Sequence, residues 1–314
     1  MHIHAVMVRM NTKSEKYLRS APLRYDPLND FLFYKIMGEK GNEKQLLGFL
    51  NAVLGKTGED QFTSVEIIEN KTFTPEALGD KSCTLDVRAV LQGKTKINVE
   101  VQLRDQRNMN RRSLFYWSKE YSQSLSAGMD YSELPDVITI NIVNYNYPPV
   151  EEFHTCYHLW EDKNKDYILT NALEIHYINM VQYRKQGRGK LHDPLCRWLS
   201  WLDKDTPPEM LAKAAKMDEA IMTAEERMVY VTGDEEAIRA YWRRQMALAD
   251  RIGELNYARD EGLAQGRSEG REAGHKEGCI EKAFEIARKM KNAGRPVSEI
   301  EEFTGLSSES IKEL

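Results

Sequence analysis

The sequence predicts an α/β fold with a helical second half. Two short helices come first, and they are followed by three strand-like runs, a helix and three further strand-like runs. Most residues after position 193 follow a helical pattern. Helices interleaved with strands in this way are typical of a sheet covered by helices. The 314 residues exceed what one hydrophobic core usually holds, so we expect about two domains.

The first two helices are predicted from their end signals. Asp26 is a typical N-cap residue, and Pro27 is favoured at the first position of a helix that runs to Met37. A second helix is expected at residues 42–54, because Gly55 supplies a helix-ending residue. Residues 1–20 show no such signals and are expected to form an N-terminal extension.

Strand-like runs follow at residues 65–71, 84–92 and 96–103. The last two flank Gly93-Lys94-Thr95, which predicts a β-hairpin with a three-residue loop. The remaining elements are expected to be a helix at 108–127, an apolar strand at 136–143, strands at 152–160 and 172–180, and helices from Asp193 to about Ala264.

A glycine repeat divides the helical second half. Glycine occurs at every fourth position from Gly262 to Gly278, and each glycine costs about 1 kcal/mol in a helix relative to alanine. This favours a flexible linker; a helix whose glycines face a partner helix is the alternative. We therefore expect a main domain at 21–255, a linker at 256–278 and a helical module at 279–314. We predict that this module makes the protein a homo-oligomer, such as a dimer, through Ala283, Phe284, Ile286, Ala287 and Met290.

Composition excludes several classes of protein. With 44 Lys+Arg against 49 Asp+Glu the net charge is −5, so nucleic acid would have to be bound by a local basic patch. No apolar run approaches the ~20 residues of a membrane-spanning helix. The first ten residues resemble no secretory signal, and we expect a cytoplasmic protein.

The spacing of cysteines and histidines predicts no metal site. The four cysteines show no C-x-x-C pattern, so we expect reduced and mostly buried thiols. His154 and His158 share one face of a strand-like run, but no third ligand lies near them in the sequence.

Acidic residues of the predicted hairpin form a candidate metal site. Asp86 interrupts a run of good strand formers, although strand interiors disfavour aspartate. Glu100 and Gln102 alternate onto one face of the next strand. With a loop at 93–95, Asp86 would face Gln102 and lie about 7 Å from Glu100, a separation at which two carboxylates can bind one Mg²⁺ or Mn²⁺. A solvated face of the strand pair is the alternative.

Segments on both sides of this hairpin extend the pattern. They are Asn29-Asp30-Phe31-Leu32-Phe33-Tyr34-Lys35 before it and Arg111-Arg112-Ser113-Leu114-Phe115-Tyr116-Trp117 after it. Together with the D-x₁₃-E-x-Q spacing of Asp86, Glu100 and Gln102, they resemble the Rpn family of recombination-promoting nucleases and transposase-like proteins. That family is a branch of the PD-(D/E)XK nuclease superfamily, and the resemblance extends over most of the chain.

The resemblance implies a restriction-endonuclease-like fold and Mg²⁺-dependent endonucleolytic cleavage of DNA. It implies Asp86 and Glu100 as metal ligands and Asp30 as a third acidic residue of the site. The superfamily pattern expects lysine where this chain has Gln102, and a neutral amide can orient an attacking water only by hydrogen bonds. A degenerate nuclease fold that binds DNA or protein therefore stays an alternative. A nuclease for RNA or single strands is another, because such a site acts on the phosphodiester and not on the sugar.

A basic segment follows the hairpin. Residues 104–120 carry a local charge of +3 in an acidic protein. Helical periodicity predicts that Leu114, Trp117, Tyr121 and Leu125 face the core and that a basic stripe faces away from it. We predict that this segment binds DNA phosphates, and a solvated helix face is the alternative. The predicted DNA-binding residues are Arg107, Arg111, Arg112, Tyr116 and Lys119.

Overall fold

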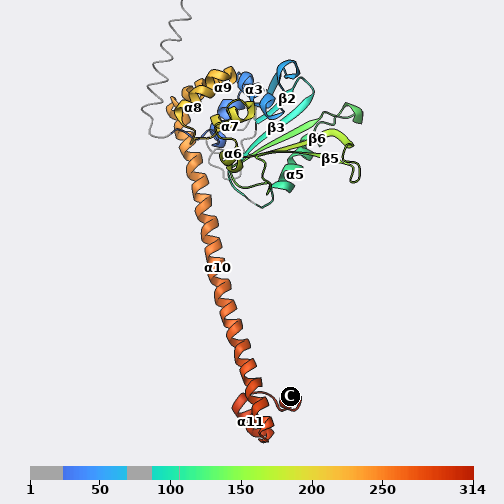
Figure 1. Ribbon diagram of the computed structural model, residues 1–314, viewed down its shortest axis with the longest axis vertical. Helices are drawn as coiled ribbons and strands as arrows, with labels where there is room; N and C mark the ends of the chain where they lie inside the picture. The colour runs from blue at the N-terminus through green and yellow to red at the C-terminus, as the bar shows by residue number, and fades with distance from the viewer. Residues whose placement is uncertain (1–23, 69–86, 106) are drawn as a thin grey trace, which may run out of the picture. The chain divides into compact units, whose positions relative to one another are not determined.

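The computed structural model describes residues 24–68, 87–105 and 107–314. The chain divides into two compact units, Met1–Ala247 and Leu248–Leu314, which we describe separately (Figure 1).

A six-stranded mixed sheet forms the centre of the first unit, with the strand order β1-β2-β3-β4-β6-β5. Strands β3, β4 and β6 run parallel to one another, whereas β1, β2 and β5 pair antiparallel with their neighbours. The predicted α/β class is confirmed. The strands are β1 (Val65–Ile68), β2 (Val87–Leu91), β3 (Thr95–Gln102), β4 (Val137–Val143), β5 (His154–Trp160) and β6 (Ile168–Asn179).

Several helices cover one face of this sheet and enclose the main core. Fully buried Trp198 packs edge-to-face on Phe49 with ring centroids 5.8 Å apart, and Val99 and Ile140 of the sheet belong to the same core. The helices of this part are α2 (Asp30–Met37), α3 (Glu43–Val53), α6 (Met180–Gln186), α7 (Pro194–Leu202), α8 (Pro208–Met217) and α9 (Glu219–Thr232), with short 3₁₀ turns at Gly58–Asp60 and Tyr131–Glu133.

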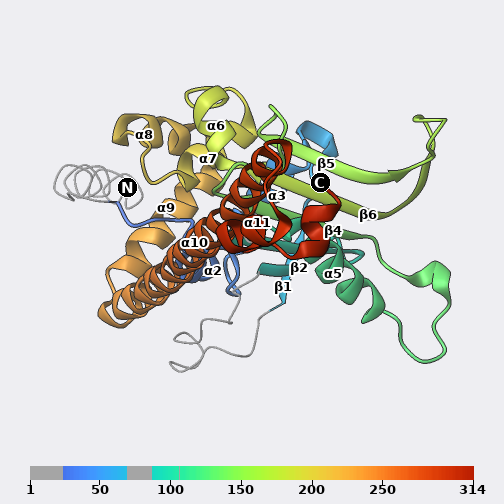
Figure 2. The ribbon, with the colours of Figure 1, turned by 90° about the horizontal axis from the view of Figure 1, so that it is seen from below.

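Helix α5 (Met109–Ser122) lies on the opposite face of the sheet from α3 and α7 (Figure 2). Met109 and Ser113 are its buried residues. Leu114 and Leu125, which the periodicity predicts as core, are 50% and 42% exposed. This part of the prediction is wrong, because Arg112 and Ser113 of α5 turn toward polar partners on the sheet. Trp117 of the same predicted stripe does pack against the core, beside Met109.

The start of α2 also differs from the prediction. The helix begins at Asp30, and the side chain of Asn29 caps it by accepting a hydrogen bond from the Leu32 amide at 3.2 Å. Asp26, predicted as the cap, instead accepts from the Leu28 amide in the preceding turn. Asp30 is therefore the first residue of the helix.

The hairpin between β2 and β3 has a different loop from the predicted one. Gln92 and Gly93 adopt left-handed conformations with φ of 49° and 67°. Lys96 consequently pairs with Val90, whereas the prediction paired it with Gln92. The predicted register is wrong by two residues, and Asp86 lies outside the described residues.

Helix α10 (Glu235–Asn292) is 58 residues long and includes the whole glycine repeat. The repeat is thus helical, unlike the flexible linker that the glycine content favours. Good helix formers and ion pairs one turn apart, such as Lys276–Glu272 at 2.7 Å, offset part of the cost of the glycines. Within the described part of the chain, no helix has the length and apolar composition needed to span a membrane.

The second unit ends in a small helical module. The end of α10 packs with α11 (Val297–Thr304) and α12 (Ser308–Lys312). Ala287 of the predicted self-association stripe is buried there with Ile300 and Ile311, and Met290 packs against them. Part of the predicted stripe therefore builds this core.

Candidate active site beneath α5

Neighbouring strands bring a row of polar side chains to the sheet face that α5 covers. Glu100 of β3 lies beside Asn141 of β4, which lies beside Tyr177 of β6. The Ser113 hydroxyl of α5 is 3.2 Å from Asn141 Oδ1 and accepts a hydrogen bond from the Tyr177 hydroxyl at 2.9 Å. These contacts fix α5 over the row through polar groups.

Glu100 and Arg112 form a buried ion pair in this row. The Glu100 side chain is 1% exposed, and its Oε1 accepts from Arg112 Nε at 3.0 Å and from Nη2. Its second oxygen, Oε2, is buried and has no hydrogen-bond partner among the described residues. Burial raises the pKa of Glu100, although Arg112 acts in the opposite direction. Glu100 therefore has one oxygen held by Arg112 and one available to a further ligand.

Two more unpaired oxygens lie on the same face. Asn98 is paired with Thr139 across β3 and β4, and it precedes Glu100 by two positions along β3. Asn98 Oδ1 and Thr139 Oγ1 are both buried without a hydrogen-bond partner in the described ranges. Buried polar atoms are normally hydrogen-bonded, so this group of oxygens fits bound water or a hydrated cation. Oxygen donors of this kind suit Mg²⁺ or Mn²⁺.

Gln102 and Asp30, the other described residues of the predicted site, have partners of their own. Gln102 follows Glu100 on the same face, is half-buried, and donates to the Arg104 carbonyl at 3.2 Å. The Asp30 carboxylate receives Arg244 Nε at 2.8 Å and Nη2 at 2.5 Å, so this salt bridge fastens α2 to α10. The salt bridge accounts for the charge of Asp30, and a catalytic role for it stays a prediction.

The basic residues predicted to bind DNA fall into two groups. Arg112 turns toward Glu100, and its guanidinium lies 5.1 Å from the centroid of the Tyr116 ring. Arg112 therefore does not face away from the core, as helical periodicity predicts, because the buried carboxylate of Glu100 attracts the guanidinium. Its role in binding DNA stays a prediction. The exposed group contains Arg107, Arg111 and Lys119.

Sequence reasoning missed two partners at this site. Asn141 lies in a run that the sequence predicts only as an apolar strand, although a single amide within such a strand points to a polar partner. Arg88 of β2 pairs with Glu120 of α5 at 2.6 Å and holds the far end of that helix. That contact joins residues far apart in the sequence, and no local pattern predicts it.

Comparison with protein families agrees with this fold. The model of the PD-(D/E)XK nuclease family transposases matches residues 27–258, which include every strand of the described sheet together with α5. Comparison with curated proteins and with solved structures gives no match. The sheet and its helices are consistent with the restriction-endonuclease-like fold of that family. Since the match extends over more than half of the sequence, the chain belongs to the PD-(D/E)XK nuclease family of transposases.

Proposed function

We propose that this protein is a cytoplasmic, metal-dependent endonuclease that hydrolyses phosphodiester bonds in DNA. The observation that carries the proposal is the buried Glu100 carboxylate, whose Oε2 lacks a hydrogen-bond partner among the described residues. Glu100 would hold Mg²⁺ or Mn²⁺ together with Asp86, which lies outside the described residues. When bound, the ion would polarise the phosphoryl oxygen and lower the pKa of an attacking water.

The remaining residues of the site would position these groups. Arg112 binds Glu100 through Oε1, so the guanidinium can stay in place while Oε2 takes another ligand. Gln102 stands two residues after Glu100 and would orient the attacking water, because an amide both donates and accepts hydrogen bonds. Its neutral side chain supplies no charge to stabilise a hydroxide.

The direct test is incubation of the purified protein with supercoiled plasmid. We expect nicked or linear DNA with Mg²⁺ or Mn²⁺ and intact plasmid with EDTA. Equal cleavage in EDTA would contradict metal dependence. DNA binding without cleavage under all metal conditions would favour a degenerate nuclease fold that only binds DNA. Preferential cleavage of RNA or single-stranded DNA of the same sequence would favour a nuclease for those substrates.

We further propose that the exposed basic residues beside α5 bind phosphates. Replacing Arg111 and Lys119 with alanine should weaken DNA binding for all sequences and lower the slope of log K against log salt by about 1 to 2. The matched control replaces Arg239 and Arg259, which are exposed on α10. An equal slope in the test and parental proteins would mean that the basic residues beside α5 are only solvated.

We also propose that the second unit mediates self-association. Ile280 and Phe303 are 54% and 71% exposed beside a core of only three buried side chains. Such apolar exposure is typical of a surface that a second copy covers. In light scattering we expect the parental protein to have twice the mass of one chain and the Ile280→Ser/Phe303→Ser variant to be monomeric. Tyr131→Ser, at an exposed aromatic residue of the first unit, is the control, and an unchanged mass in the double variant would contradict the proposal.

A further inference from the structure

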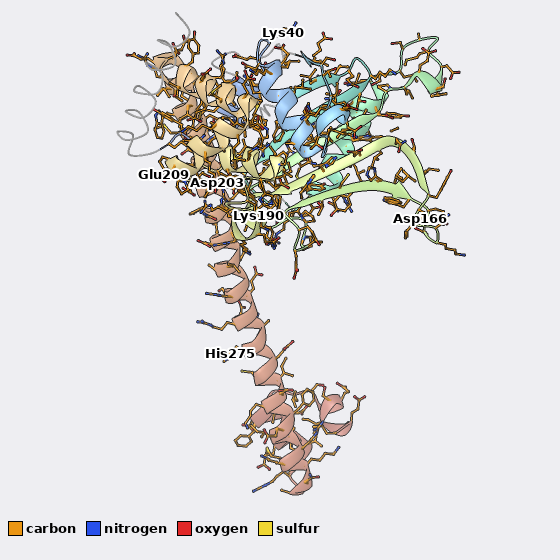
Figure 3. The ribbon with its side chains drawn as sticks, turned by 45° about the horizontal axis from the view of Figure 1, so that its top comes forward. Lys40, Asp166, Lys190, Asp203, Glu209 and His275 are labelled. Carbon is orange, nitrogen blue, oxygen red and sulfur yellow. The ribbon has the colours of Figure 1, made fainter. Side chains whose placement is uncertain are left out.

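The β5–β6 hairpin carries a second group of ligand-type side chains, on the face of the sheet opposite to α5. Asp166 marks the loop of this hairpin in Figure 3. Cys156 of β5 pairs with His176 of β6. The neighbouring Tyr177 contacts Ser113 of α5, and successive strand residues point to opposite faces. The group around His176 is therefore separated by the sheet from Glu100.

The donor atoms of this group already lie close together. One ligand atom each from Cys156, Glu174 and His176 lies within 4.8 Å of the other two. His176 Nε2 is 3.6 Å from Cys156 Sγ and 2.5 Å from Glu174 Oε1. His158 Nε2 lies 3.2 Å from the same sulfur. Ligands of a tetrahedral zinc ion are roughly 3.3 to 3.7 Å apart, so small side-chain movements would give this geometry.

His154 supports the orientation of His176. Its Nε2 lies 2.9 Å from His176 Nδ1, and the two rings stack with centroids 5.1 Å apart. A metal-bound histidine usually donates its other ring N–H to a nearby acceptor. His176 is 4% exposed, and its Nε2 faces Cys156 and Glu174 while its Nδ1 faces His154. This arrangement is that of a metal ligand with an outer partner.

We propose that Cys156, His158, Glu174 and His176 bind one zinc ion and that His154 positions His176. The mixture of sulfur, nitrogen and oxygen donors favours Zn²⁺ over Mg²⁺ or Ca²⁺, which prefer oxygen alone. Four protein ligands fill a tetrahedral zinc ion, so the site would be structural.

Zinc would have a clear structural use at this position. β5 is an edge strand, and its pairing with β6 shifts register between Tyr157 and Leu159, beside the proposed ligand His158. Cys156 and His176 pair just before this irregularity, and His158 and Glu174 lie within it. An ion bound by all four would fasten β5 to β6 where the hydrogen-bond ladder is interrupted.

The test uses the full chain, purified without a histidine tag. Elemental analysis is expected to give about one zinc per chain, and Co²⁺ substitution should give tetrahedral visible absorption with a thiolate charge-transfer band. Cys156→Ser should lose that band and the bound zinc. Cys279→Ser is the matched control, because Cys279 is also exposed and lies 3.9 Å from a histidine nitrogen, on α10.

Two further measurements make the result decisive. His154→Ala should weaken zinc binding by about 10 to 100-fold, as expected of an outer partner. Chelation should lower the Tm of the parental protein and leave that of Cys156→Ser unchanged. A parental chain without zinc or the Co²⁺ bands, or a Cys156→Ser variant that keeps both, would overturn the proposal. Plasmid cleavage tests the Glu100 site separately, because zinc content does not depend on it.

Discussion

Replacement of Glu100 with glutamine should reduce plasmid cleavage more than about a hundredfold, because loss of a direct metal ligand exceeds the 10 to 100-fold typical of outer partners. The same loss is expected for Asp86→Asn. DNA binding should be unchanged or slightly tighter, since a negative charge near the phosphate disappears. Cleavage rates with Mg²⁺ and binding affinities for one duplex provide the measurements.

The control for this prediction is Glu226→Gln, at an exposed position of α9. Gln102→Ala should cost about tenfold to a hundredfold, because it loses only an orienting hydrogen bond, and Gln102→Lys should preserve or raise the rate. If a Glu100 or Asp86 variant is shown by circular dichroism to be folded and still cleaves at the parental rate, the hairpin is not the active site.

The second large effect concerns stability. Arg112→Met should lower the free energy of unfolding by about 3 to 5 kcal/mol at neutral pH, because it leaves the carboxylate of Glu100 buried without its counter-charge. The double variant Arg112→Met/Glu100→Gln should recover most of this loss, since it removes both charges. Urea unfolding of the single and double variants measures both quantities, and equal stability of all of them would contradict the buried pair.

The loss of stability in Arg112→Met should depend on pH, because the Glu100 carboxyl titrates. Burial raises the folded-state pKa of Glu100 above its ordinary value of 4.5, so the folded chain binds a proton more readily than the unfolded chain. The contribution of Glu100 to stability is then fully present below about pH 4.5 and is lost as the pH rises through the raised folded pKa. Removing Arg112 removes a cation that lowers this pKa, so we expect the destabilisation to shrink as the pH falls. Equal destabilisation at acidic and neutral pH would contradict this account.

Local patterns predicted the strands close to their observed positions, because alternation and turn residues act over few residues. The hairpin register could not be settled in this way. Loops at 92–94 and at 93–95 both contain three residues, and a register shift of two leaves every side chain on the same face. The periodicity that placed Glu100 and Gln102 together is therefore compatible with both registers.

The rotation of α5 and the histidine–cysteine group depend on contacts between distant segments. From its sequence, the face of α5 that carries Leu114 would be expected to pack on the sheet. In the structure Leu114 is exposed, because Glu100 and Asn141 offer buried polar partners to Arg112 and Ser113. His176 follows Cys156 by 20 residues and meets it only because β5 and β6 pair. Neither arrangement can be predicted before the sheet is assembled.

Only one of the two Glu100 oxygens is paired with Arg112, and this ion pair affects how a polyanion would approach the site. Because Arg112 balances the carboxylate, a phosphate bound at the proposed site would meet a pair without net charge, and repulsion at close range would be reduced. The same guanidinium contact holds the carboxylate in one orientation. If Glu100 is the metal ligand that we propose, its Oε2 would already be held in one orientation, and little free energy would be needed to rearrange the site.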